Sequence, residues 1–213
     1  MSSRFVCTPL PLNGLVRVQR QPLHDMRGLF ERLFCADELA AARWTQPIAQ
    51  INHSITRQRG SVRGLHYQRP PHAEMKLVSC LRGEVWDVAV DLRAGSPTFL
   101  QWHAERLSAD NACALLIPPG FAHGFQALSD DTELLYLHSA AYAPGAEAGL
   151  NPLDPLLALA WPLPVAEMSD RDRSHALLTD LFEGVHLGSA DTAANRCISR
   201  SWTWAARRRL TPT

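Results

Sequence analysis

The sequence predicts a mainly β fold, a jelly-roll β-barrel with a few short helices, and two observations support this prediction. The first is alternation: Glu84–Leu92 (EVWDVAVDL) has an apolar residue at every second position and Asp87 and Asp91 on the other face, the period of a half-buried strand. The second is the number of short candidate strands that follow one another with turns rich in Gly and Pro between them, which is typical of sandwiches and barrels.

The other elements follow from the same signals in chain order. Further strands are expected at Ile48–Thr56, Ser61–Gln68, Met75–Leu81, Phe99–Leu107, Ala112–Ile117 and Glu133–Ala140. Turn chemistry separates them at residues 58–60, 69–71, 82–83, 94–97, 118–120 and 129–131. Short helices are expected at Ala36–Arg43 and Ser169–Leu178, and no internal repeat is visible.

The length of 213 residues fits one domain with a sizeable core. We place this domain at residues 1–182. Residues 183–213 differ in character, because the stretch from Arg196 onward is rich in arginine and has no acidic residue. They are expected to form a basic C-terminal appendage, of unknown role, that is loosely attached and solvated.

Charge and cysteine usage exclude several classes of function. The 21 basic and 21 acidic side chains cancel, so nothing attracts the whole chain to nucleic acid or to an anionic membrane. Five scattered cysteines without a CxxC pair argue against a disulfide framework and against structural zinc. With no secretory signal and no apolar run of about 20 residues, we expect a cytoplasmic protein that does not enter membranes.

Several segments carry residues suited to acid–base chemistry. In Arg63–Gln68, alternation places Gly64, His66 and Gln68 on one face, and a histidine facing the inside of a barrel needs a partner or a ligand. A hydrogen-bonded core histidine is the simpler explanation of His66 alone. Lys76 and Tyr136 also lie in expected strands, and taken singly they are equally consistent with a solvated lysine and a core aromatic.

Two more segments complete the set. Ile117–Phe125 combines a tight Pro-Pro-Gly turn with His123 near a strand start, which places an imidazole at a barrel mouth. Asp172 has a purely structural interpretation as well, because Ser169 and Asp172 match the spacing of a helix capping box.

Together these segments resemble the dTDP-4-dehydrorhamnose 3,5-epimerase family. The similar pieces occur in family order between Asp25 and Asp172, about two-thirds of the chain. They are Asp25-x-Arg27-Gly28-x-Phe30, Gln50–Ser54, Arg63–Gln68, Lys76-Leu77-Val78, Gly83–Asp91, Ser96–Phe99, Leu107-Ser108-x-x-Asn111, Ile117–Phe125, Leu135-Tyr136 and Trp161-Pro162. The resemblance implies a cupin-type jelly roll, a homodimer, no metal and no cofactor.

The resemblance also implies roles for individual residues. His66 is similar to the base, Tyr136 to the acid on the opposite face of the sugar, Asp172 to the carboxylate that pairs with His66, and Lys76 to the cation beside the developing enolate. This set is chemically consistent, because a proton next to a ketone is acidic only when the enolate is stabilised. The implied substrate-binding residues are Arg27, Phe30, Gln50, Asn52, Arg63, His123, Tyr142, Glu147 and Arg171, with Tyr142 stacking on the nucleotide base.

The implied activity is epimerisation at C3, C5 or both of a nucleotide-linked 4-keto-6-deoxyhexose, in deoxysugar biosynthesis. Arg32 stands where the family usually has glutamate, Ile51 where it often has aspartate, and Ala141 where a second aromatic often precedes Tyr142. Since arginine can only donate hydrogen bonds, Arg32 would suit cytosine better than thymine, so a CDP-linked sugar is one alternative to dTDP. A metal-dependent cupin and a catalytically silent sugar-nucleotide binding protein are alternatives from other classes.

Overall fold

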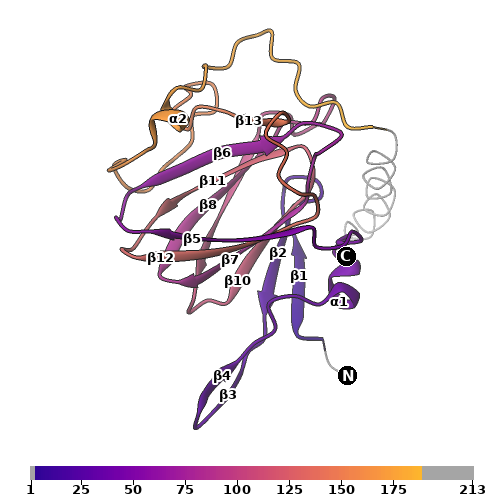
Figure 1. Ribbon diagram of the computed structural model, residues 1–213, viewed down its shortest axis with the longest axis vertical. Coiled ribbons are helices and arrows are strands. Elements are labelled where there is room, and N and C mark those ends of the chain that lie inside the picture. The colour runs from indigo at the N-terminus through magenta and orange to yellow at the C-terminus, as the bar shows by residue number, and fades with distance from the viewer. Residues whose placement is uncertain (1–2, 189–213) are drawn as a thin grey trace, which may run out of the picture.

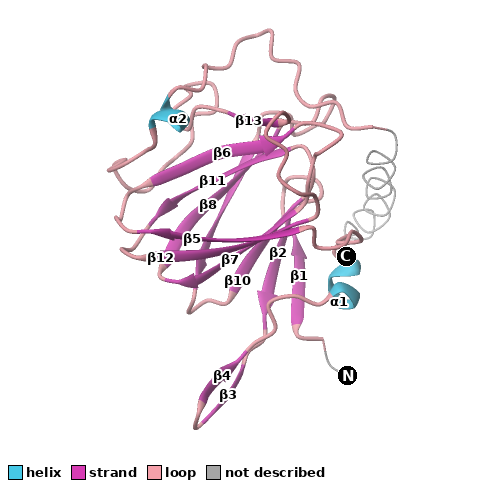
Figure 2. Cartoon of the chain, in the orientation of Figure 1, coloured by secondary structure: helices cyan, strands magenta, loops and turns pink. Residues whose placement is uncertain are grey.

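A computed structural model describes residues 3–188, and its core consists of two antiparallel sheets that face each other (Figures 1 and 2). The first sheet has the order β1 (Phe5–Pro9), β2 (Val16–Arg20), β10 (Cys113–Ile117), β7 (Lys76–Arg82), β12 (Thr132–His138) and β5 (Gln50–Thr56). The second has the order β13 (Glu147–Gly149), β6 (Val62–Gln68), β11 (Phe121–Ala127), β8 (Glu84–Asp91) and β9 (Trp102–Ser108). This confirms the predicted mainly β, cupin-like jelly roll.

All seven predicted strands are present, with shifts of up to three residues at their ends. The prediction of a strand from Phe99 was wrong at that end, because Thr98 and Leu100 take part in a turn, Leu100 with a φ of 59°, before β9 begins at Trp102. Strands β1, β2 and β13 and the short pair β3 (Leu23–Asp25) and β4 (Gly28–Phe30) were not predicted. In Ile117–Phe125 we expected a turn followed by the start of a strand. The strand is present as β11 (Phe121–Ala127).

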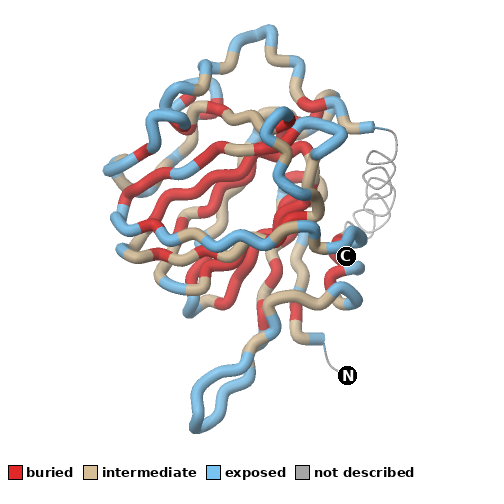
Figure 3. The backbone as a smooth tube through the Cα atoms, viewed as in Figure 1, coloured by how far each residue is buried: buried red, intermediate tan, exposed pale blue. Residues whose placement is uncertain are grey.

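The core has three apolar layers, one between the sheets and one on the outer face of each (Figure 3). Leu115, Ile117, Phe125 and Leu134 belong to the inner layer. The outer face of the first sheet is covered by the segment around α1 (Ala36–Ala40), which contributes Leu39 and Trp44. The outer face of the second sheet is covered by the chain after Leu150.

This third layer corrects one prediction. Strand β8 was expected to be half-buried, with Asp87 and Asp91 toward water, but both carboxylates are fully buried. The apolar face of β8, with Val88 and Val90, packs under the C-terminal segment, so its polar face points into the barrel. A sequence pattern of period two does not tell which face meets water when both are covered.

Both predicted helices are shorter than expected. Helix α1 ends at Ala40, and the chain then turns at Arg43, which has a φ of 73°. Helix α2 comprises only Asp170–Arg173. Within residues 3–188, no helix has the length and apolar character needed to cross a membrane.

Two segments lie outside the two sheets. Strands β3 and β4 form a hairpin that extends away from the two sheets at the bottom of Figure 1. Toward the C-terminus, Val185 is buried and forms a β-bridge with Arg93. The start of the segment 183–213 therefore packs on the barrel. Residues 189–213 of the predicted appendage lie outside the described residues.

Candidate active site

A cavity of about 530 Å³ lies between the two sheets and collects most of the predicted site residues. It is lined by side chains from both sheets, namely Gln50, Ile51, Asn52, His53, Ser54, Arg63, His66, Tyr67, Gln68, Glu74, Lys76, His123, Gly124, Phe125, Tyr136, His138, Tyr142 and Glu147. His66 comes from β6 of the second sheet, whereas Lys76 and Tyr136 come from β7 and β12 of the first. An imidazole and a phenol therefore enter one cavity from opposite walls.

His66 is held by Asp172. Its Nε2 donates to Oδ1 of Asp172 at 2.7 Å, and the carboxylate is almost fully buried while His66 stays partly open to the cavity. Burial raises the pKa of Asp172, but the hydrogen bond and charge of His66 and the Gly64 amide outweigh it, so the pKa lies below its ordinary value. An ionised carboxylate here fixes the imidazole and stabilises its protonated form.

The capping interpretation of Asp172 is half correct. Ser169 Oγ accepts the Asp172 backbone N–H at 3.0 Å and caps α2, as the spacing predicts. The Asp172 carboxylate, however, turns to His66 and to the amide of Gly64, which donates at 3.2 Å. One short helix thus brings one carboxylate behind His66, within hydrogen-bond distance of its imidazole.

The orientation of β6 differs from simple alternation because the strand is irregular next to β11. His66 is opposite His123, but Arg63 is opposite Phe125, so three steps on β6 match two steps on β11. The extra residue turns both Arg63 and His66 into the cavity, although their spacing would put them on opposite faces. His66 and Gln68 share the cavity face, as alternation predicted, and Leu65 and Tyr67 lie on the other; the pattern fails only on the Arg63 side of the irregularity.

Lys76 is buried among polar partners. Its Nζ lies 3.2 Å from the carbonyl oxygen of His66 and 3.2 Å from a carboxylate oxygen of Glu74. Glu74 also pairs with Nδ1 of His138 at 3.1 Å. Burial raises the pKa of Glu74, yet His138 and Lys76 together hold it below its ordinary value. Alternation could have indicated Glu74, which stands two residues before Lys76.

Tyr136 is a weak acid that is partly buried between the two sheets. Its hydroxyl lies 3.1 Å from Oγ of Ser54 on the neighbouring strand β5. Burial, the larger effect, raises the pKa of Tyr136 well above its ordinary value, and the Ser54 hydrogen bond offsets only part of that. The phenol is therefore protonated at any ordinary pH and available as a proton donor.

Sequence reasoning missed Asp87. Its Oδ2 lies 2.8 Å from Nε2 of His123, and both side chains are buried. Burial raises the pKa of Asp87 despite the opposing charge of His123. His123 thus has a fixed orientation toward the cavity, and its ring stands edge-on to Tyr136 at 6.0 Å between centroids.

A hydrogen-bonded chain of side chains surrounds the mouth of the cavity. Gln50 accepts the amide of Tyr142 at 2.9 Å and donates to Asn52 at 3.0 Å. Glu147 accepts the Tyr142 hydroxyl at 2.5 Å and pairs with Arg171 at 2.6 Å. This hydrogen-bonded series therefore brings together five predicted binding residues, Gln50, Asn52, Tyr142, Glu147 and Arg171. The Tyr142 side chain is half exposed.

Two predicted binding residues are not brought to the cavity of this chain. Arg27 and Phe30 lie on the β3–β4 hairpin, where Phe30 is 72% exposed and Arg27 pairs with Asp25 at 2.5 Å. The hairpin points away from the barrel (Figure 1). Within one chain these residues therefore do not complete the site.

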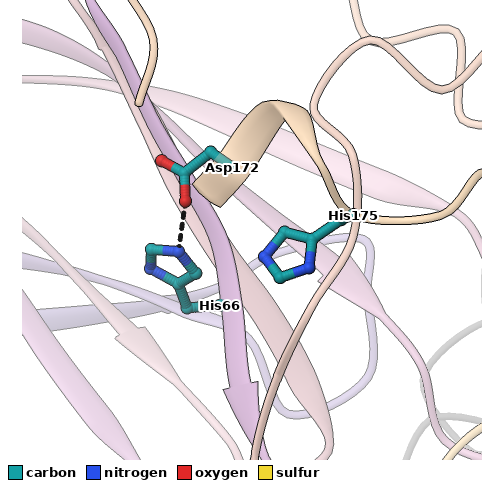
Figure 4. Close-up of side chains that lie close together, drawn as sticks. All are labelled: His66, Asp172 and His175. Carbon is teal, nitrogen blue, oxygen red and sulfur yellow. Dashed lines mark hydrogen bonds and ion pairs between the residues drawn. The ribbon is translucent and has the colours of Figure 1, made fainter. Parts of the chain in front are cut away.

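A second imidazole next to His66 was also missed. His175 follows α2, and its ring lies edge-on to His66 with 6.3 Å between centroids (Figure 4). Burial and the charge of His66 lower the pKa of His175. No strand pattern covers this position, so alternation gave no signal for it.

Comparisons with known proteins agree with this geometry. A family model described as dTDP-4-dehydrorhamnose 3,5-epimerase matches residues 9–180. The chain is 50% identical over 176 residues to the dTDP-4-dehydrorhamnose 3,5-epimerase of Pseudomonas aeruginosa, covering 81% of this chain and 96% of that protein. It is 42% identical over 168 residues to the dTDP-4-dehydro-6-deoxyglucose 3-epimerase of Streptomyces bikiniensis, covering 78% and 85%.

A solved structure gives the same result. The dTDP-6-deoxy-D-glucose-3,5-epimerase of Legionella pneumophila, in complex with dTDP-4-keto-L-rhamnose, superposes with a TM-score of 0.80 at 37% identity, covering 87% of this chain and 100% of that one. Fold, cavity and these similarities define the class of the protein as an isomerase. The chain belongs to the dTDP-4-dehydrorhamnose 3,5-epimerase family, which confirms the resemblance drawn from its motifs.

Proposed function

We propose that this chain epimerises a dTDP-linked 4-keto-6-deoxyhexose at C3 and C5 in deoxysugar biosynthesis. The observation that carries the proposal is that His66 and Tyr136 enter one cavity from opposite sheets. Inversion of a carbon needs a base on one face of the sugar and an acid on the other, and these two walls supply them.

The proposed mechanism assigns a step to each group. Because Nε2 of His66 is bound to Asp172, Nδ1 is the atom that takes the proton next to the ketone. The electron pair moves onto the carbonyl oxygen, and the ammonium of Lys76 stabilises the enolate. Tyr136 then gives its proton to the same carbon from the other face, and solvent exchange returns both groups to their starting states.

The nucleotide is proposed to bind at the cavity mouth. Tyr142 offers an exposed ring for stacking on the base, and Arg63 offers forked donors to the diphosphate. Arg32, which would have favoured cytosine, pairs with Glu38 instead and is thereby occupied within this chain. This supports dTDP over CDP, and calorimetry with the two nucleotides tests it, with tighter binding of CDP as the contradicting result.

A homodimer and a cytoplasmic location are parts of the proposal. Met26, Leu29 and Phe30 present apolar surface on the hairpin, and in one chain they contact little. A second copy could cover this surface and receive Arg27 and Phe30 at its own cavity, which would give both residues the binding role expected of them. Arg27 would then add a second guanidinium for the diphosphate.

The number of inverted carbons separates two versions of the activity. One relative is a 3,5-epimerase and another is a 3-epimerase, and the chain resembles both. Incubation of dTDP-4-dehydro-6-deoxy-D-glucose in D2O, followed by NMR, tests the proposal: deuterium is expected at C3 and C5, whereas deuterium at C3 alone would assign a 3-epimerase.

Two variants control this experiment. His66→Ala should abolish the exchange, while His103→Ala, which removes an imidazole from strand β9, should leave it intact. Binding of the substrate without any exchange by the unmodified chain would instead identify a silent sugar-nucleotide binding protein.

A further inference from the structure

His66, Asp172 and His175 form a group with the composition of a metal site. One ligand atom from each residue lies within 4.8 Å of the others, and among residues 3–188 this is the one group of at least three His, Cys, Asp or Glu side chains that does so. Figure 4 shows the His66 ring directly below the Asp172 carboxylate and the His175 ring to the right of both. Two imidazoles and one carboxylate are a ligand set that Zn²⁺ and similar divalent ions accept.

The His175 ring contributes an independent observation. Its Nε2 is buried and has no hydrogen-bond partner in the described part of the chain. Leaving a buried polar atom without a partner is energetically unfavourable, so such an atom calls for an explanation. In Figure 4 this nitrogen is on the side of the ring that faces His66 and Asp172.

The backbone leaves room for this ring. Gly149 on β13 is opposite His66 on β6, and a Cβ at position 149 would clash with the His175 ring. The missing side chain of Gly149 therefore lets the second imidazole lie beside the first. The charges around this ring are mixed, because Asp172 and Glu147 act on His175 as anions and Arg171, which pairs with Glu147 at 2.6 Å, acts on it as a cation.

We infer that His66 Nε2, Asp172 and His175 Nε2 bind a divalent transition-metal ion of the Zn²⁺ class, and that the bound ion inhibits the enzyme. Ligand atoms that share a tetrahedral zinc ion lie about 3.3 Å apart, so the 2.7 Å contact between His66 and Asp172 has to open by only about half an ångström. A water molecule would supply the fourth ligand of a tetrahedral ion.

Inhibition follows from the chemistry of imidazole. When Nε2 binds a metal ion, the ring proton is on Nδ1, which is the atom proposed to take the proton from the sugar. The ion also removes Asp172 from its role as partner of a protonated ring. The inhibition rests on the proposed function, whereas the metal binding does not.

Metal binding is tested first, without any substrate. Zn²⁺ alone is titrated by calorimetry into the full chain and into His175→Ala, and Co²⁺ alone is followed by its visible absorption. One ion per chain is expected, with a cobalt spectrum that lacks a thiolate charge-transfer band, since no cysteine belongs to the group. His175→Ala should weaken binding at least 10- to 100-fold.

Matched variants keep the test decisive. His103→Ala removes an imidazole that pairs with Glu105 at 2.8 Å, a similar pair with no third ligand, and should leave the affinity unchanged. His175→Gln serves if His175→Ala does not fold, as judged by circular dichroism. Equal affinity in the unmodified chain and the folded His175 variant, or binding that does not saturate at one ion, overturns the proposal.

Activity is tested second, by deuterium exchange into the sugar. Zn²⁺ at one equivalent should stop the exchange, and EDTA should restore it. For each protein, inhibition is expressed as a fraction of its own rate without Zn²⁺. Half-inhibition of the His175 variant should need at least 10-fold more Zn²⁺ than half-inhibition of the unmodified chain. Unchanged exchange at saturating Zn²⁺ overturns the inhibition. If metal binding depends on His175 but the metal-free chain exchanges nothing, the metal site stands and the proposed function fails.

Discussion

The carboxylate of Asp172 joins a catalytic candidate to the backbone that positions it. Oδ1 accepts from His66 Nε2 at 2.7 Å, and Oδ2 accepts from the amide of Gly64 at 3.2 Å, two residues earlier on the same strand. Ser169 caps helix α2 by accepting the backbone N–H of Asp172. The side chain of Asp172 therefore links helix α2 to strand β6. This link is the basis of the first two predictions.

Asp172→Asn should lower the rate of epimerisation by about 10³-fold while substrate binding changes little. The amide keeps the shape of the carboxylate, but it carries no charge to stabilise the protonated imidazole. Steady-state kinetics give the answer through kcat and KM measured separately. A rise in KM with unchanged kcat would show that Asp172 acts only in binding.

The same pair predicts a dependence of stability on pH. The pKa of Asp172 in the folded chain lies below its value in the unfolded chain, about 3.9, so the ionised carboxylate stabilises the fold above that pH. This contribution is lost as the pH falls below about 4 through the folded pKa. Urea unfolding between pH 2.5 and 6 should show a steeper acid loss of stability for the unmodified chain than for Asp172→Asn. Parallel curves would contradict the prediction.

Tyr136→Phe should separate proton removal from inversion. The base still reaches the sugar, so deuterium from D2O should still enter next to the ketone, but without the phenol the new C–H bond forms mainly on the original face. We expect inverted product to fall about 10²- to 10³-fold relative to exchange. Ser54→Ala, which removes the hydrogen-bond partner of the phenol, is the milder control. Equal losses of exchange and inversion in Tyr136→Phe would place the phenol in a different role.

How far the sequence predicts the site depends on the regularity of each strand. Alternation placed Lys76 and Tyr136 in strands but left their surroundings open, and the resemblance assigned both to the site; β7 and β12 pair there in a continuous register. Alternation failed for Arg63 because β6 gains a residue against β11. Such an irregularity depends on the neighbouring strand, which a local pattern does not contain.

Other residues were missed because their environment is tertiary. Asp87 looks solvent-facing in a strand of period two, and only the C-terminal cover on the opposite face of β8 turns it into the barrel. His175 follows a helix of one turn and reaches His66 through the path of the chain after α2. The hairpin residues Arg27 and Phe30 were predicted from resemblance alone, and within residues 3–188 of one chain they lie away from the cavity.

Gly64→Ala should destabilise the fold more than Gly28→Ala, although both glycines have positive φ. At Gly64, with a φ of 112°, a Cβ would lie 2.6 Å from Gly124 Cα and 2.7 Å from the His123 carbonyl oxygen, whereas at Gly28 nothing is within 4 Å. We expect a loss of about 3 kcal/mol or more at Gly64, from strain and overpacking, and about 1 kcal/mol at Gly28, from strain alone. Thermal and urea unfolding measure both, and similar losses would refute the close packing of β6 against β11.

The exposed β3–β4 hairpin predicts a dimer of this chain on which substrate binding depends. Phe30→Ser removes the ring that is 72% exposed in one chain and should shift the molecule toward monomer, with a several-fold higher KM, if a second copy covers this surface. Leu181→Ser is a matched control, because Leu181 is 87% exposed in the chain after α2, away from the hairpin in the sequence, and its replacement should change neither quantity. Light scattering after gel filtration gives the mass, and kinetics on the same samples give KM. A Phe30→Ser chain that stays dimeric with unchanged KM would remove the hairpin from both the interface and the site, whereas a dimer with raised KM would leave it in the site alone.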